Sequence, residues 1–378
     1  MATTVYRCNR PEKRLGDTFF ISECRQPFRP LSMMVYSLPS VHADNEWSPL
    51  RSVIVGRAGI ACFPSAPDRM IEATIPSEHA SKFKPKTMFP PDLIFKAEAE
   101  LDMFTSILQE NGIKVYRPPK DIDWLAEDGY TGAMPRDGLM SVGNTLIEAC
   151  FAWPSRSNEI EIGFTPILQQ LALDPRVKIV RRPKDTFADT LFDDDGTKND
   201  HWAINNSRPA FDTADFMRFG TTIIGQLSHV TNQAGVDWVI KNLPKGYKVE
   251  IIEVNDPNAM HIDATILPLR QGLLVYNPKK VTEQALRKHT VLADWELLPY
   301  PFTPENRMTP PLYMTSPWLC LNALVLDGQN MVVEANDLRS LEWFESLGMT
   351  CIPCPFQHVN SIGGSFHCAT VDLVRQGI

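Results

Sequence analysis

One pattern recurs five times along the chain, and it limits the possible fold more than any other feature. In each case a segment with the apolar spacing of a helix is followed by a short apolar strand that runs into proline. The strands are "IKVYRPP", "VKIVRRP", "YKVEIIEVNDP", "WELLPYP" and "MTCIPCP", which start at residues 113, 177, 247, 295 and 349. A supersecondary unit repeated in this way predicts a repeat architecture.

The helices before these strands are expected over residues 92–112, 163–173, 232–243, 281–289 and 337–348. Before the last four helices lies a candidate hairpin with turn residues in its middle, over 138–149, 215–226, 263–277 and 321–335. No hairpin stands directly before the first helix. It can form only if "FHCATVDLVRQG" at 366–377 pairs with "LRSVIVGR" at 50–57.

This closure predicts an α/β fold, a five-bladed pseudo-symmetric ββαβ propeller, whose joined ends leave few free sheet edges. Residues 47–378 are expected to form one domain, and residues 1–46 an irregular N-terminal arm. The segment 183–210, with "FDDDG", is expected to be an insertion or a long loop. The alternative is an open α/β sheet with ordinary alternation of strands and helices.

The first strand of each unit begins with polar residues. Equivalent positions in a pseudo-symmetric ring lie at the same end, near its axis, so residues far apart in sequence would converge on one pocket. They are Asp137 in "PRDG", Asp212 and Asp215 in "FDTADF", His261 and Asp263 in "MHIDAT", Ser316 in "TSPWLCLN", and His367 with Cys368 in "SFHC".

Carboxylates, an imidazole and a thiol form a chemically sensible set if the ligand is a cation. A thiol is only slightly ionised at neutral pH, and a nearby positive charge increases its ionised fraction. A guanidinium is planar and permanently charged, and it offers paired N–H donors to aspartate. The set therefore suits a cationic electrophile, such as a guanidinium, which the carboxylates would hold and which would itself favour the thiolate.

Each residue also has a structural interpretation. A buried cysteine is commonly a small hydrophobe, and we assign Cys62, Cys150 and Cys320 to that class. His261 could be a core histidine with satisfied hydrogen bonds, and Asp212 or Asp215 could cap a local turn. The common phase of these residues in the repeat favours a functional role.

A metal site is the competing cluster. The stretch "CIPCPFQH" offers Cys351, Cys354 and His358 as ligands. However, the two cysteines lie inside a predicted strand, and no second cysteine pair stands at zinc-finger spacing. We expect neither a metal nor an organic cofactor.

Composition excludes several classes of partner. The chain has 37 basic and 45 acidic residues, a net charge of −8 and no long basic run, so neither nucleic acid nor a membrane surface is expected to bind. No apolar run reaches the length of a membrane span, and the first residues do not resemble a secretion signal. Eight cysteines without such a signal indicate free thiols and a cytoplasmic protein.

Six motifs together resemble the arginine-dependent amidinotransferases, which include glycine, inosamine-phosphate and cyanobacterial toxin enzymes. They are "PRDG", "FDTADFMR", "SHVTNQAGVDW", "DPNAMHIDAT", "YMTSPWL" and "IGGSFHCAT", and the similarity runs from about residue 47 to the end. The resemblance implies the five-bladed propeller and a catalytic triad of Cys368, His261 and Asp215. It also implies that Asp137 and Asp263 hold the donor guanidinium, with Thr315 and Ser316 near the donor's amino-acid end.

One departure from the family pattern concerns the donor carboxylate. Where the glycine enzyme has arginine after "NPD", this chain reads "NPKK", which places Lys280 at the position expected to meet that carboxylate. Lysine supplies the charge but not a bidentate fork, so donor affinity or donor choice could differ.

The expected reaction transfers the amidino group of L-arginine through an amidino-cysteine to a primary amine, and releases L-ornithine. We expect residues 1–46 to lack a mitochondrial transit peptide, which favours a bacterial enzyme of secondary metabolism with an acceptor larger than glycine. A homodimer is a further expectation. Glycine as the acceptor, a deiminase that hydrolyses arginine or agmatine, and a non-catalytic protein that binds guanidino compounds or a metal are the alternatives.

Overall fold

The computed structural model describes residues 38–65, 68–183, 189–193, 201–304 and 309–376. All of them belong to one compact unit that begins at Leu38. This unit begins earlier than the expected domain boundary at residue 47. Val41 and Ala43 are fully buried, and Ala43 and Asn45 form bridges to two different hairpins. Residues 1–37 of the expected arm lie outside the described residues.

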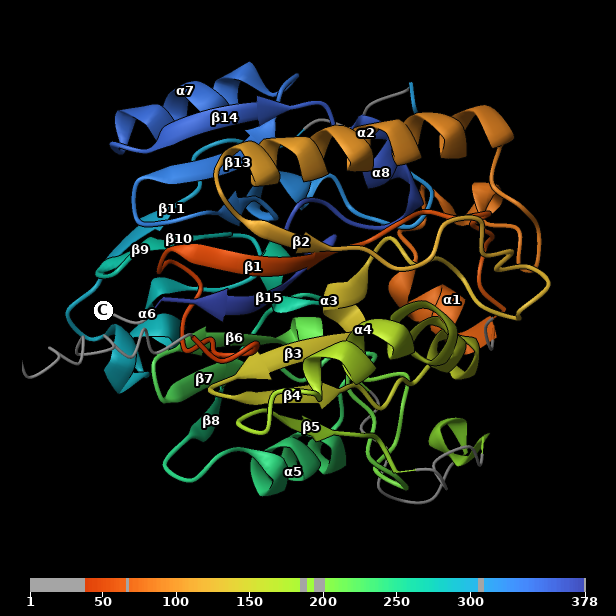
Figure 1. Cartoon of the computed structure of the whole chain (residues 1–378), viewed down its shortest axis with the longest axis horizontal. Helices are drawn as coiled ribbons and strands as arrows, with labels where there is room; N and C mark the ends of the chain where they lie inside the picture. The colour runs from red at the N-terminus through yellow and green to blue at the C-terminus, as the bar shows by residue number, and fades with distance from the viewer. Residues whose placement is uncertain (1–37, 66–67, 184–188, 194–200, 305–308, 377–378) are drawn as a thin grey trace, which may run out of the picture. The chain divides into compact units, whose positions relative to one another are not determined.

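Five three-stranded sheets make up the unit, as the repeat predicts (Figure 1). They are β15 (Thr370–Arg375), β1 (Leu50–Val55) and β2 (Lys114–Tyr116); β3 (Leu139–Val142), β4 (Thr145–Glu148) and β5 (Lys178–Val180); β6 (Phe216–Phe219), β7 (Thr222–Gly225) and β8 (Lys248–Ile251); β9 (Ile266–Arg270), β10 (Leu273–Tyr276) and β11 (Glu296–Pro299); and β12 (Leu324–Val325), β13 (Asn330–Glu334) and β14 (Thr350–Cys354). In every sheet the first two strands pair antiparallel and the last two pair parallel.

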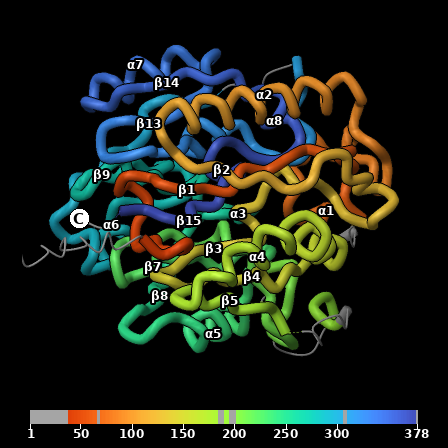
Figure 2. The backbone as a smooth tube through the Cα atoms, viewed as in Figure 1, coloured from red at the N-terminus to blue at the C-terminus, as the bar shows by residue number. Residues whose placement is uncertain are grey.

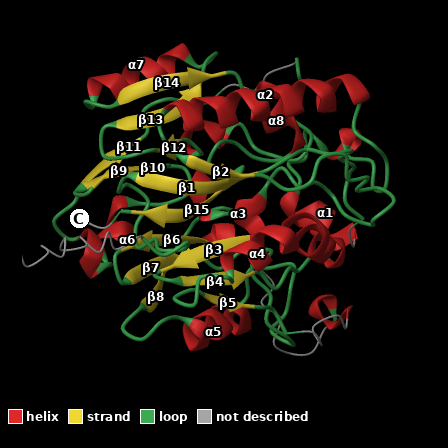
Figure 3. Ribbon diagram, viewed as in Figure 1, coloured by secondary structure: helices red, strands yellow, loops and turns green. Residues whose placement is uncertain are grey.

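A helix joins the middle strand of each sheet to its parallel outer strand, which is the crossover that parallel pairing requires. These helices are α2 (Pro91–Glu110), α4 (Thr165–Leu171), α5 (Gln233–Asn242), α6 (Glu283–Arg287) and α7 (Leu338–Ser346). All five overlap the segments predicted from apolar spacing. Figure 3 shows them beside the sheets, with α2 also packed against α8 (Gln357–Ile362).

Side chains at the helix starts explain where three of these helices begin. Asn232, Thr282 and Asp337 each accept a hydrogen bond from the backbone N–H three residues later, at the starts of α5, α6 and α7. The capping side chain gives this N–H the hydrogen-bond acceptor that it lacks within the helix, which favours a helix start at that residue.

The ring closes between segments from opposite ends of the sequence, as predicted. Strands β1 and β15 pair antiparallel, with Leu50 opposite Arg375 and Val55 opposite Thr370. Figure 2 shows the red and blue ends of the described chain side by side. This pairing supplies the hairpin that is missing before α2.

Burial differs between the strands of one sheet. Every residue of β3 and β4 is buried, whereas β5 begins with an exposed lysine and only its last residue is buried. Inner and middle strands are covered on both faces, so most of their residues are apolar, and the charged residues in β6 and β15 are buried as well. The polar groups at the beginnings of the inner strands are therefore enclosed by the protein.

Two further expectations concern a loop and the membrane. In the predicted insertion 183–210, the described residues form a short 3₁₀ turn, Asp189–Phe192, and no strand. Across the described ranges, every helix is either too short or too polar to span a bilayer.

Candidate active site

Short turns at the beginnings of the inner strands carry the predicted polar residues. The turn α3 (Pro135–Gly138) leads into β3, Thr213–Asp215 into β6 and Ile262–Ala264 into β9. Cys368 stands two residues before β15. The phase of the repeat thus brings these residues to one end of the ring, as expected.

Cys368 and His261 meet at this end, beside a carboxylate. A nitrogen of His261, Sγ of Cys368 and a carboxylate oxygen of Asp137 all lie within 4.8 Å of one another. Nε2 of His261 lies 3.0 Å from Oδ2 of Asp212, and Nδ1 lies 3.6 Å from Oδ1 of Asp137. The backbone of His261 has a φ of 65°, a strained value for a residue with a side chain. Its ring is therefore held by two carboxylates on a fixed backbone.

The residue that contacts His261 is Asp212, so the expected pairing of His261 with Asp215 is wrong. Asp215 accepts hydrogen bonds from Gln226 at 2.8 Å and Ser228 at 2.7 Å, and from the hydroxyl of Thr231. Its carboxylate thus anchors the loop after β7. Burial in that position raises the pKa of Asp215 to about 6.

A buried arginine that the sequence analysis did not single out lies behind the two catalytic candidates. Nη1 of Arg156 is 3.0 Å from Oδ2 of Asp137 and 3.5 Å from Oδ2 of Asp212. Its other nitrogens bind Glu159, and its guanidinium stacks over Tyr130. Arg156 therefore compensates the charge of both aspartates.

Asp263 lies on the other side of the thiol. Its Oδ2 accepts from Sγ of Cys368 at 3.2 Å and lies 2.9 Å from Nδ1 of His367. Asn322, which the sequence analysis also missed, donates to the same sulfur at 3.1 Å and accepts from the backbone N–H of Cys368 at 3.0 Å. The only feature of the sequence that points to Asn322 is its position between "TSPWLCL" and β12, the fourth inner strand.

One oxygen of each aspartate at the site is buried without a hydrogen-bond partner among the described residues. These atoms are Oδ1 of Asp137, Oδ1 of Asp212 and Oδ1 of Asp263. Buried polar atoms in native proteins are nearly always paired, and an unpaired one costs free energy. The site thus offers acceptors to a ligand with several N–H groups.

The charges around the thiol oppose its ionisation. Burial, followed by the Asp263 carboxylate, raises the pKa of Cys368 to about 12. Burial alone would lower the pKa of His261, but Asp137 and Asp212 outweigh it and raise that pKa well above its usual value. Burial and the carboxylates thus oppose ionisation of the thiol, although His261 favours it, and a further cation bound beside the sulfur would favour the thiolate more.

A cavity of about 490 Å³ opens onto this cluster. Gly364 leaves room for the sulfur, because a Cβ at that position would lie 2.8 Å from Sγ of Cys368. Lys280 lines the cavity and forms an ion pair of 2.9 Å with Asp256. Six predicted site residues line it: His261, Asp263, Lys280, Thr315, Ser316 and Cys368.

The alternative metal cluster of Cys351, Cys354 and His358 does not assemble. Cys351 and Cys354 pack into two different apolar clusters, and Nδ1 of His358 pairs with Glu100. The set of Cys368, His261 and Asp137 is compact, and its carboxylate already forms an ion pair with Arg156.

The chain is similar in sequence to known amidinotransferases. The chain is similar to mitochondrial glycine amidinotransferase of Danio rerio, with 37% identity over 89% of this chain and 83% of the relative. It is also similar to the L-arginine:L-lysine amidinotransferase of Pseudomonas savastanoi pv. phaseolicola, with 36% identity over 88% and 93% of the two chains. No protein-family model matches the chain.

Solved structures show the same similarity. An amidinotransferase of the saxitoxin biosynthetic pathway from Microseira wollei superimposes with a TM-score of 0.81 and 32% identity, over 90% of this chain and 98% of that one. The inosamine-phosphate amidinotransferase of Streptomyces griseus gives a TM-score of 0.78 and 28% identity, over 89% and 97%. Together with the sequence relatives, these structures show that the chain belongs to the amidinotransferase family.

Proposed function

We propose that this enzyme transfers the amidino group of L-arginine to a primary amine through a covalent intermediate on Cys368. The observation that supports this most is a pair of buried oxygens beside the thiol that have no hydrogen-bond partner among the described residues, Oδ1 of Asp263 and Oδ1 of Asp137, which only faces Nδ1 of His261 at 3.6 Å. A guanidinium presents N–H donors along each of its edges to such oxygens, and its carbon would then face the sulfur.

The remainder of the donor would extend along the cavity. Lys280 offers a positive charge for the α-carboxylate, and its partner Asp256 offers a negative charge for the α-ammonium group. Thr315 and Ser316 line the same cavity and can donate hydroxyl groups to the amino-acid end. This assignment gives the zwitterionic end of arginine a partner for each charge.

In the first half-reaction, the incoming guanidinium favours loss of the thiol proton to solvent. The Cys368 sulfur attacks the guanidinium carbon, a C–S bond forms, and the bond from this carbon to Nε of arginine breaks. The protonated His261 gives its proton to that nitrogen, which leaves as the side-chain amine of ornithine. The enzyme now carries an amidino-cysteine cation and a neutral His261.

In the second half-reaction, an amine replaces ornithine in the cavity. Its nitrogen attacks the amidino carbon and gives a proton to His261, and the C–S bond breaks to return the thiolate. Asp212 stabilises the imidazolium whenever it forms. Atoms and charges balance without a cofactor, because the sulfur carries the group between the two amines.

For the acceptor, we propose a primary amine larger than glycine, used in secondary metabolism. A cavity of about 490 Å³ that must hold arginine also has room for an amine of similar size. One relative is named for lysine as the acceptor, and one similar structure is named for toxin biosynthesis. Another relative is named for glycine, so glycine is the second candidate to test.

A panel of amines with L-arginine tests the proposal, with ornithine, citrulline and new guanidines read by mass spectrometry. We expect ornithine that depends on an added amine, and an amidino adduct on Cys368 when arginine is added alone. Cys368→Ala should lose turnover and adduct, while the matched control Cys351→Ala keeps both. Citrulline without an amine would indicate a hydrolase, and activity in Cys368→Ala would refute the mechanism.

A further inference from the structure

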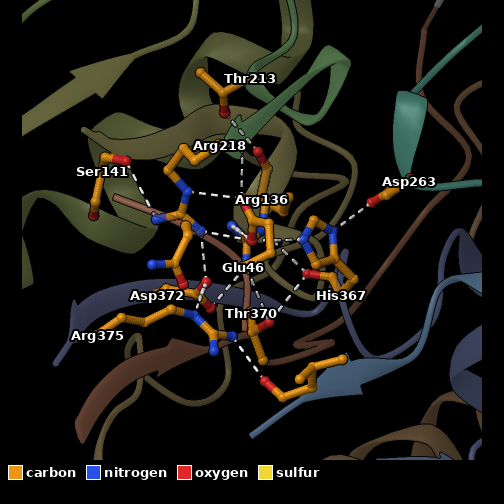
Figure 4. A network of polar contacts seen from close by, with 12 residues as sticks. Glu46, Arg136, Ser141, Thr213, Arg218, Asp263, His367, Thr370, Asp372 and Arg375 are labelled. Atoms are coloured by element: carbon orange, nitrogen blue, oxygen red, sulfur yellow. Dashed lines mark hydrogen bonds and ion pairs between the residues drawn. The ribbon is translucent and has the colours of Figure 1, made fainter. Parts of the chain in front are cut away.

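We infer that His367 is a positioning residue, an imidazolium fixed below the site that orients Asp263 for the donor guanidinium. This inference rests on the proposed function, because it concerns the carboxylate that would hold arginine. His367 neighbours Cys368 in sequence, yet its ring lies between two carboxylates, those of Asp263 and Glu46 (Figure 4).

Both ring nitrogens of His367 face an acceptor. Nδ1 lies 2.9 Å from Oδ2 of Asp263, and Nε2 lies 3.4 Å from Oε2 of Glu46. A neutral imidazole carries one N–H, so both contacts can be hydrogen bonds only when the ring is a cation. Burial and the nearby Arg136 oppose that charge, but the two carboxylates outweigh them and raise the pKa of His367.

A rigid set of buried charges supports the ring from below (Figure 4). Arg218 binds both oxygens of Glu46 at 2.7 Å and donates to Asp372 at 2.6 Å. Asp372 also accepts from Arg136 at 2.9 Å and from Arg375 at 2.7 Å. Each member is at least nine-tenths buried. Glu46 therefore cannot move freely, and it fixes where Nε2 of His367 lies.

The consequence for Asp263 is a single orientation. His367 and the thiol both bind Oδ2, which leaves Oδ1 as the acceptor without a partner among the described atoms. Without the charge of His367, a thiolate 3.2 Å away would repel the negative charge of Asp263 and favour protonation of this carboxylate. The imidazolium keeps the carboxylate ionised and turned, so the donor meets a preformed acceptor.

Two substitutions of His367 distinguish a role in orienting Asp263 from a role in packing alone. In His367→Asn, the amide nitrogen can take the place of Nδ1 and still donate to Asp263. In His367→Gln, the amide nitrogen can take the place of Nε2 and reach Glu46 instead. We expect His367→Gln to raise KM for L-arginine by about 10- to 100-fold, the usual worth of a hydrogen bond to a charged group, while His367→Asn recovers most of the parent KM.

The comparison also distinguishes failure of this inference from failure of the proposed function. Asp263→Asn should raise KM for arginine at least as much as His367→Gln. If Asp263→Asn binds arginine like the parent, the proposed donor site is wrong. If Asp263→Asn is impaired while the two His367 variants share the same KM, only the positioning role is overturned.

A measurement on the unaltered enzyme keeps the inference testable even if the His367 variants fail to fold. In protein labelled with ¹⁵N at histidine, with the resonances assigned to residues, we expect the imidazole of His367 to keep protons on both nitrogens to a higher pH than an ordinary histidine, whose pKa is about 6.5. A spectrum in which His367 loses one of these protons at or below that ordinary pKa would overturn the inference.

Discussion

Replacement of Asp212 by asparagine should remove most of the turnover without unfolding the enzyme. Asparagine keeps the size of the side chain and an oxygen acceptor for His261, but it removes the negative charge 3.0 Å from Nε2. The imidazolium that forms when the acceptor loses its proton is then less stable. Turnover therefore falls even though the geometry of the site is kept.

Coulomb's law gives the size of this effect. At 3.0 Å, and with an effective dielectric constant of about 20, the pair is worth roughly 5 kcal/mol, or about 10⁴-fold in rate. Arg156 lies 3.5 Å from the same oxygen and already compensates part of its charge. We therefore expect a loss of between about 10²- and 10⁴-fold in kcat.

The assay is initial-rate formation of ornithine with a saturating amine, together with thermal denaturation of each variant. Asp215→Asn is the matched control, because it lies three residues away and contacts Gln226, Ser228 and Thr231 instead of His261. We expect this control to stay within about tenfold of the parent, since Asp215 interacts with His261 only through its charge and forms no hydrogen bond with the imidazolium. Equal losses in the two variants, or a larger loss in Asp215→Asn, would refute the assignment of Asp212.

Three further predictions concern the thiol, the buried charges and metal. With a pKa of about 12, roughly one Cys368 thiol in 10⁴ is ionised at pH 8. The rate at which Cys368 is alkylated in the free enzyme should therefore rise about tenfold per pH unit up to about pH 10. A plateau of this rate near pH 8.5 would contradict the raised pKa. Burial raises the pKa of Glu46, but Arg218, His367 and Arg136 together outweigh burial and lower this pKa in the folded state. Glu46 therefore stabilises the fold above its unfolded pKa of about 4.3 and loses this effect as pH falls toward the folded value. Glu46→Gln should lower the free energy of unfolding by about 3–5 kcal/mol at neutral pH and reduce the dependence of this free energy on acidic pH, as measured by urea denaturation. An unchanged pH profile would count against the charge network. Prolonged chelation should leave activity intact, whereas loss of activity together with bound zinc would favour a metal mechanism.

The fold was predictable because its signals are local. Each outer strand follows its helix directly and runs toward proline, and each hairpin has its turn residues in the middle. The pairing of β1 with β15 is long-range, but it followed from counting, because one hairpin was missing and one strand at each end was left over.

The sequence predicted where the site residues lie in the repeat, but not which of their side chains contact one another. Asp212 and Asp215 flank the same short turn, and periodicity cannot tell which carboxylate turns toward His261. Arg156 and Glu159 lie outside the repeating pattern, in the irregular connection after β4, so no phase argument reaches them. Asn322 resembles any residue before a strand until its contacts with Cys368 are seen. Partners of this kind depend on side-chain geometry across several units.

The pairing of β1 with β15 also sets the order in which activity can arise during synthesis. The ribosome makes β1 early and β15 more than three hundred residues later, and Cys368 stands two residues before β15. A growing chain therefore carries four sheets and most of the pocket walls before it has the nucleophile. The reactive sulfur enters only with the strand that closes the ring, so an unfinished chain cannot start the chemistry in a half-built site.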